Sequence, residues 1–109
     1  LEGITRRTVL ALAEELGIPT QTRPIDRSEI YIADEAFFCG TGVRIFAIAS
    51  VDHRPIGSGR IGPVTKQLRE HYFRVVRGQE PKYAHWLTPV YAERPTAWQA
   101  ADAAQAVAV

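Results

Sequence analysis

Methionine is absent from this sequence of 109 residues, cysteine occurs once and lysine twice. The single thiol, Cys39, excludes an internal disulfide framework, and we expect it to be buried and reduced. No apolar run approaches the length of a membrane-spanning helix, and the sequence shows no signal-peptide pattern. We therefore expect a soluble, cytoplasmic protein that has no membrane partner.

The charge balance is also nearly neutral, and the chain is short. A net charge of +1 indicates no general attraction to nucleic acid or to anionic membranes. A chain of this length forms one domain or a piece of a larger one. Because it starts at Leu1, with a helix entry directly after it and no methionine, we expect that natural sequence upstream is missing.

The usual catalytic and metal-binding patterns are missing as well. The sequence contains no serine nucleophile elbow and no phosphate-binding Walker loop, and His53, His71 and His85 lack metal-ligand spacing. We expect His53 at an exposed turn, the other two histidines on helix surfaces, and Lys66 and Lys82 in solvent. The residues alone therefore predict no catalytic group and no metal site in this chain.

One stretch stands out among the residues that are present. Two aromatic residues lead into Gly40-Thr41-Gly42, and a mostly apolar run follows over residues 43–51. This pattern predicts a strand over residues 36–39, a tight turn, and a strand over residues 43–51. Consecutive amide groups in such a turn bind anions in some proteins, with the Thr41 hydroxyl as a further donor. A plain hairpin turn, whose glycines only allow positive φ, is the alternative.

Helix signals surround this hairpin. Apolar spacing predicts a helix over residues 6–16, capped by Thr5 and stopped by Gly17. Its N-terminus is a second possible anion seat, with plain capping as the alternative. Capping-box spacing from Asp26 to Glu29 predicts a short helix to residue 33. Pro63 opens a long helix to residue 77, and a helical turn follows over residues 82–87.

Residues 11–22 also resemble the first helix and turn of a DNA-binding helix-turn-helix. That motif needs a recognition helix directly after the turn. Thr20, Thr22 and Pro24 disfavour a helix there, and Arg23 is the only basic residue of the segment. We therefore set nucleic-acid binding aside, unless a helix runs through residues 20–24.

Four motifs in one order carry a family resemblance. Leu-Glu-Gly-Ile-Thr-Arg at residues 1–6, Phe-Phe-Cys-Gly-Thr-Gly at 37–42 and Gly-Arg-Ile-Gly-Pro-Val-Thr-Lys at 59–66 resemble successive motifs of the class IV aminotransferases. The run Lys-Tyr-Ala-His-Trp-Leu-Thr-Pro-Val at residues 82–90 is similar to the end of the branched-chain amino acid aminotransferases. The resemblance covers residues 1–91 and leaves out an alanine-rich tail at residues 92–109.

The resemblance implies an α/β fold: part of the large C-terminal domain of the fold-type IV aminotransferases, with a barrel-like mixed sheet and packed helices. It implies pyridoxal 5′-phosphate as cofactor, bound through its phosphate by Ile4, Thr5 and Thr41. Gly42 and Val43 would hold the substrate carboxylate, although many relatives carry two alanines there. The substrates would be branched-chain amino acids and 2-oxo acids such as 2-oxoglutarate, and the parent enzyme would be a homo-oligomer.

The sequence departs from the family in one large respect. The lysine that binds the cofactor covalently precedes the Gly-Ile-Thr motif in the family, and neither Lys66 nor Lys82 matches its position. We therefore expect no catalytic residue here and an inactive chain whose parent is the enzyme. Two alternatives stay open: a related class IV activity, such as D-amino acid transamination or aminodeoxychorismate cleavage, and a non-catalytic chain that binds a phosphorylated ligand or a partner.

Overall fold

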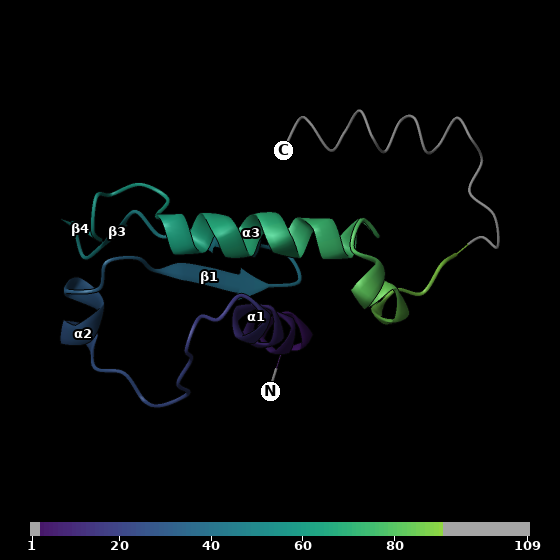
Figure 1. Cartoon of the computed structure of the whole chain (residues 1–109). Helices are drawn as coiled ribbons and strands as arrows, with labels where there is room; N and C mark the ends of the chain where they lie inside the picture. Colours follow the sequence, from purple (N-terminus) through teal and green to yellow (C-terminus); the bar gives the residue numbers. More distant parts are fainter. Residues whose placement is uncertain (1–2, 91–109) are drawn as a thin grey trace.

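The computed structural model describes residues 3–90. Two long helices, a short helix and two small hairpins make up this part (Figure 1). In chain order the elements are α1 Ile4–Glu15, α2 Arg27–Tyr31, β1 Phe37–Gly40, β2 Arg44–Ala47, β3 Ser50–Val51, β4 Arg54–Pro55, α3 Pro63–Val76 and the 3-10 helix η1 Pro81–Trp86. The predicted tail at residues 92–109 lies outside the described residues.

The central hairpin confirms that the two strands around the glycine turn are neighbours in one sheet. Strand β1 pairs antiparallel with β2, with Cys39 opposite Ile45 and Phe38 opposite Phe46. Alternate residues point to opposite faces of a strand, so Cys39 and Ile45 join the core while Phe38 and Phe46 are exposed by more than half. Helices α1 and α3 therefore cover one face of the hairpin only.

The prediction of one continuous strand over residues 43–51 is wrong. The Ile48 N–H donates to the Ala36 carbonyl at 2.8 Å, but the Ala49 carbonyl accepts from the Ile56 N–H at 2.9 Å. The pairing partner thus changes within two residues, and Ser50–Val51 pairs with Arg54–Pro55 in a separate hairpin. The described sheets are both two-stranded and antiparallel.

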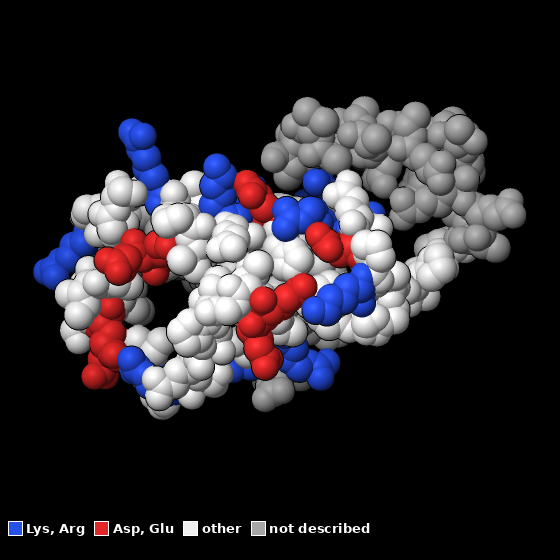
Figure 2. Space-filling view, in the orientation of Figure 1, with Lys and Arg blue, Asp and Glu red and all other residues white. Residues whose placement is uncertain are grey.

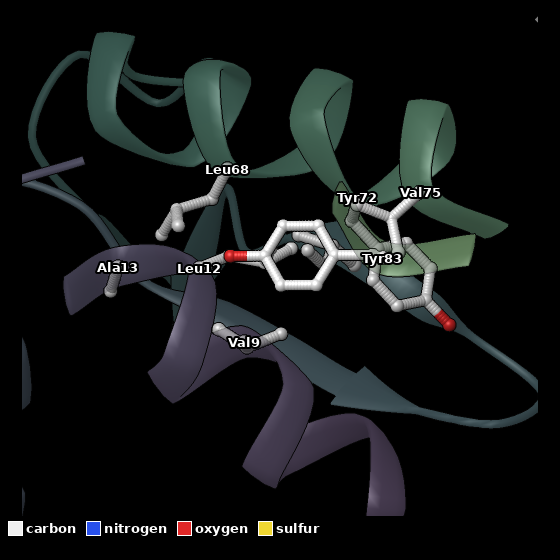
Figure 3. Close-up of a cluster of buried hydrophobic side chains, with 8 residues drawn as sticks. Val9, Leu12, Ala13, Leu68, Tyr72, Val75 and Tyr83 are labelled. Carbon is white, nitrogen blue, oxygen red and sulfur yellow. The ribbon is translucent and has the colours of Figure 1, made fainter. Parts of the chain in front are cut away.

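The core forms where α1 and α3 meet against the hairpin. Figure 3 shows Val9, Leu12 and Ala13 of α1 facing Leu68, Tyr72 and Val75 of α3, with the Tyr83 ring of η1 beside them. The predicted face of α1 is confirmed. The apolar residues of α3 predicted a stripe of Val64, Leu68, Tyr72, Val75 and Val76. The three central residues are buried, but Val64 and Val76 are 39% and 42% exposed, and Thr65 and His71 are buried in their place.

Both long helices end in the same way. The helix α1 ends before Gly17, which has φ +74°, and the N–H groups of Gly17 and Ile18 bond back to Glu14 and Ala13. The helix α3 repeats this arrangement with Gly78 and Gln79. These are Schellman motifs, which satisfy the last carbonyl groups of a helix. The predicted stop at Gly17 is confirmed, and the predicted end of α3 near residue 77 coincides with Gly78.

The segment between α1 and α2 contains no helix, so the helix-turn-helix alternative is wrong. Residues 18–26 form neither helix nor strand, and the Arg23 guanidinium holds the Glu29 carboxylate at 2.7 and 3.0 Å. The Glu29 carboxylate also accepts the Asp26 N–H at 3.0 Å, which confirms the predicted capping pair. The α2 helix ends at Tyr31, two residues before the predicted end.

Figure 2 shows that acidic and basic side chains alternate over the viewed face, in keeping with the nearly neutral chain. Within residues 3–90, no helix is both long and apolar enough to cross a bilayer.

Candidate functional site

The first turn of α1 presents amide groups that have no acceptor within the helix. The cap residue is Gly3, in an extended conformation, and no side chain caps this end. The Arg7 N–H is the first to bond back, to the Gly3 carbonyl at 3.1 Å, so the N–H groups of residues 4–6 find no partner in the helix. The predicted cap, Thr5, lies inside the helix instead and is 6% exposed.

The electrostatics of this helix start favour an anion. The first turn contains no acidic residue, whereas Arg6 and Arg7 belong to it. The aligned peptide groups of a helix place roughly half a positive charge at its N-terminus. Two arginines add to that positive potential and do not stabilise the helix itself. An anion at the amide groups of Ile4 and Thr5 would be attracted by both contributions.

The start of α3 shows what a satisfied helix start looks like in the same molecule. The Glu35 carboxylate accepts the Val64 N–H at 3.1 Å and the Thr65 N–H at 2.9 Å. Burial by itself raises the pKa of Glu35. The hydrogen bonds that Glu35 accepts from Thr65 and Val64 outweigh this effect, so its pKa is lowered. A Cβ on Gly62 would lie 2.0 Å from the Glu35 side chain, so only glycine leaves room for this cap. Among the described residues, no carboxylate caps the start of α1 in this way.

The turn between β1 and β2 places Thr41, Gly42 and Val43 at the surface. Neither glycine of this turn has positive φ; the left-handed conformation falls on Arg44, with φ 58°. The predicted reason for the glycines is therefore wrong. At Gly42 a side chain would meet nothing within 4 Å, so open space adjoins the turn. A ligand can approach the backbone at this point.

A cavity of about 530 Å³ lies between α1, α3 and the end of η1. Ile4 and Thr5 line it, whereas Thr41, Gly42 and Val43 do not. Figure 3 shows β1 running from the Ala13 end of α1 towards its Val9 end, so the turn follows on the side where α1 begins. A single phosphate in contact with both Thr5 and Thr41 remains a prediction.

A polar cluster around the buried His71 joins α1, α3 and η1, and the sequence did not reveal it. His71 is 5% exposed, contrary to the prediction of a surface position. Its Nε2 lies 3.2 Å from Glu15, and its Nδ1 lies 3.2 Å from the Arg74 guanidinium. Because arginine only donates, Nδ1 accepts and the Nε2–H donates to Glu15. The Tyr83 hydroxyl also donates to Glu15.

These partners hold Glu15 in its charged form. Hydrogen bonds from Tyr83 and His71, followed by the ammonium group of Lys82 at 3.3 Å, lower the pKa of Glu15 from 4.5 to about 2. The hydrogen bond from the Tyr83 hydroxyl to Glu15, together with burial and the charge of Glu15, raises the pKa of Tyr83 from 10.0 to about 12. Lys82 is thus an ion-pair partner on the surface.

The remaining candidate groups lie apart from these features. His53 and His85 are exposed, as predicted, and Cys39 is a free thiol that is only partly buried. In the part of the chain that the structure describes, no group of three or more histidine, cysteine or acidic side chains is arranged to hold a metal ion.

Comparisons with known proteins agree with the motifs. The family described as amino-transferase class IV matches residues 1–51. A probable branched-chain-amino-acid aminotransferase of Aquifex aeolicus is 52% identical over 92 residues, which cover 84% of this chain and 30% of that protein.

Solved structures give the same answer for the fold. The branched-chain aminotransferase of Thermoproteus uzoniensis, solved with norvaline, matches with a TM-score of 0.79 and 50% identity, over 84% of this chain and 30% of that one. The enzyme of Thermobaculum terrenum in its PLP form matches with a TM-score of 0.80 and 51% identity, over 84% and 30%. The α/β fold is thus shared with these enzymes. The chain is related to the class IV aminotransferases, and among them to the branched-chain-amino-acid aminotransferases, of which it spans about three tenths of the length.

Proposed function

We propose that this chain is the C-terminal part of the cofactor domain of a pyridoxal-phosphate-dependent aminotransferase. The parent enzyme would transfer the amino group between branched-chain amino acids and 2-oxoglutarate. The observation that carries the proposal is the start of α1, where free amide groups and two arginines form an anion seat without an internal carboxylate. The motif Gly-Ile-Thr that forms this start belongs to the segment matched by the family.

The residues of the chain fit the phosphate of the cofactor. We assign the amide groups of Ile4 and Thr5 and the hydroxyl of Thr41 to that phosphate, and the backbone of Gly42 and Val43 to the substrate carboxylate. The open space beside Gly42 and the surface position of Thr41 support this assignment. Pyridoxal phosphate supplies the electron sink for amino-group transfer, while these residues bind and orient it.

The same contacts are too few to make the chain active alone. A hydrogen bond to a charged group contributes about 1.5–3 kcal/mol, and association itself costs at least about 4 kcal/mol, so three such bonds hold a phosphate weakly. No lysine of the chain lies at the assigned seat, because Lys82 pairs with Glu15 and Lys66 lies in α3. We therefore assign the covalent attachment of the cofactor to the rest of the parent enzyme.

The proposal extends to the architecture and setting of that enzyme. Residues 1–91 would belong to the cofactor domain, whose sheet becomes mixed and barrel-like when the remaining strands are added, and residues 92–109 would be a separate tail. Within the described residues, β1 and β2 each have one neighbouring strand only, so their outer edges can pair with further strands. The exposed Phe38 and Phe46 support a further layer packed on this face. The parent would be a cytoplasmic homo-oligomer acting on small molecules.

The decisive experiment compares the chain alone with a fusion. The fusion joins residues 1–109 to the segment of the Aquifex aeolicus relative that precedes its matching region. With pyridoxal phosphate, leucine and 2-oxoglutarate, we expect glutamate from the fusion and none from the chain alone. Turnover by the chain alone, or a borohydride-reduced adduct on Lys66 or Lys82, would contradict the proposal, as would a fusion that uses only D-amino acids.

A single substitution then tests the phosphate seat in the fusion. The change Thr41→Val removes one hydroxyl that donates to a charged group, so the affinity for pyridoxal phosphate should fall by about tenfold. Thr88→Val, at an exposed threonine outside the seat, serves as the matched control and should leave that affinity unchanged. Equal affinities in both variants would remove Thr41 from the site.

A further inference from the structure

Three arginine side chains gather around one aromatic ring of α3. The guanidinium carbons of Arg44, Arg69 and Arg77 lie 5.5, 5.6 and 4.9 Å from the centre of the Phe73 ring. Arg69, Phe73 and Arg77 follow one another at intervals of four residues, so they share one face of the helix. Arg44 reaches the same ring from the start of β2.

These charges are close enough to repel one another. Since each lies within 5.6 Å of one point, no two are more than about 11 Å apart, so their repulsion is screened only in part at physiological salt, where the Debye length is about 8 Å. Among residues 3–90, none of the ion pairs shorter than 4.0 Å involves these arginines. The C-terminal end of α3 contributes roughly half a negative charge, which offsets only part of the excess.

The donor groups of the cluster are both oriented and open. A guanidinium that stacks on an aromatic ring keeps its N–H groups at the edge of its plane, free to bind a second group. No side-chain nitrogen within the described part is buried without a partner, so these edges face solvent. Arg69 and Arg77 are half-buried beside Phe73, which limits the freedom that binding would cost them.

We propose that Arg44, Arg69 and Arg77, arranged on Phe73, form a binding site for a small multivalent anion. The ligand class is a molecule with two or more phosphate groups, because planar guanidinium forks pair with phosphate oxygens two at a time. A single monovalent anion would engage one fork and leave the other two charges uncompensated. The site shares no residue with the proposed cofactor and substrate contacts, although Arg44 directly follows the turn that holds Thr41, Gly42 and Val43. The seat at Ile4 and Thr5 lies at the N-terminal end of the other long helix.

The test is a titration of the full chain with sodium tripolyphosphate by isothermal calorimetry at constant ionic strength. Arg69→Gln with Arg77→Gln should weaken binding by at least about tenfold, since both lost contacts are charge-assisted. Arg27→Gln with Arg60→Gln removes the same charge elsewhere and should change the affinity by less than about twofold. Thermal unfolding of each variant establishes that it is folded.

A third variant separates geometry from charge. Phe73→Leu keeps every arginine and the net charge but removes the stacking surface, so tripolyphosphate affinity should fall several-fold. The conservative pair Arg69→Lys with Arg77→Lys keeps the charge without the forks and should bind at an intermediate level. Equal losses in the two glutamine pairs, an unaffected Phe73→Leu variant, or no binding of tripolyphosphate to the unaltered chain would each overturn the proposal.

Discussion

At the scale of single residues, Glu15 links α1 with both α3 and η1. It ends α1, accepts hydrogen bonds from Tyr83 of η1 and His71 of α3, and pairs with Lys82. Its lowered pKa means that the folded state binds this proton less readily than the unfolded chain. The resulting stability is present above pH 4.5 and is lost as the pH falls towards 2.

The pKa of Tyr83 shifts in the opposite direction to that of Glu15. Its pKa is raised from 10.0 to about 12, so the folded state retains the phenol proton longer than the unfolded chain. This contribution is complete below pH 10 and disappears as the pH rises towards 12.

We expect Tyr83→Phe to lower the melting temperature at pH 7 and to reduce its further decrease between pH 10 and 12. It should also move the acid-induced loss of stability closer to pH 4.5, because Tyr83 is the largest cause of the low pKa of Glu15. Melting curves from pH 2 to 12 measure both effects. Tyr72→Phe, in the same core but outside the bonds to Glu15, is the control; identical pH profiles for the two variants would contradict the assignment.

Single residues were also where the sequence was least informative. Nothing in the local pattern indicated that His71 is buried, because its partners lie 56 positions away in Glu15 and nearby in Arg74. The left-handed conformation of Arg44 was not predicted either, because the turn was attributed to the two glycines that precede it in the sequence. Both features arise from contacts between elements rather than from local preference.

At the scale of elements, the two long helices start in opposite ways. The start of α3 carries a carboxylate supplied by Glu35, and the start of α1 carries none. We expect Glu35→Gln to destabilise the chain by about 1 kcal/mol, the usual effect of losing a helix cap. Glu70→Gln, on the exposed side of the same helix, should change the free energy of unfolding by less than about 0.5 kcal/mol.

Urea unfolding of both variants measures the difference. If Glu35→Gln and Glu70→Gln have the same effect, the bonds of Glu35 to Val64 and Thr65 do not stabilise α3.

The elements that the sequence did predict are those with local signals. Apolar spacing and the glycine stops placed both long helices within two residues, and the Asp26–Glu29 spacing placed α2. The break between β2 and β3 was missed because residues 43–51 have no proline or glycine between them, and only the change of pairing partner interrupts the strand. In the site, the turn at Thr41 was predicted and the start of α1 was predicted to within two residues, although its cap is Gly3 rather than Thr5; the contrast with Glu35 depended on the fold.

At the scale of the whole molecule, the hairpin is covered on one face only. Phe38 and Phe46 lie opposite each other and are 62% and 63% exposed. In the isolated chain, Phe38→Ser with Phe46→Ser should cost no more than about 1 kcal/mol, the value of a cross-strand aromatic pair. In the fusion the cost should be larger, because burying each ring completely contributes roughly 1.5–3 kcal/mol.

Denaturant midpoints of the chain and the fusion, with and without the two substitutions, provide the comparison. An equal loss in both proteins would show that the remainder of the enzyme does not cover this face.

The free thiol of Cys39 provides a way to measure how often the β1–β2 hairpin separates from the core. It is the single cysteine of the chain, lies on the core side of β1 and is packed against the cluster below α1. A disulfide reagent reacts with such a thiol through the transient openings that expose it, so the labelling rate reports how often α1 and β1 separate. In the fusion this rate should fall if the added segment closes the sheet, and a phosphate-containing ligand at the start of α1 should slow it further.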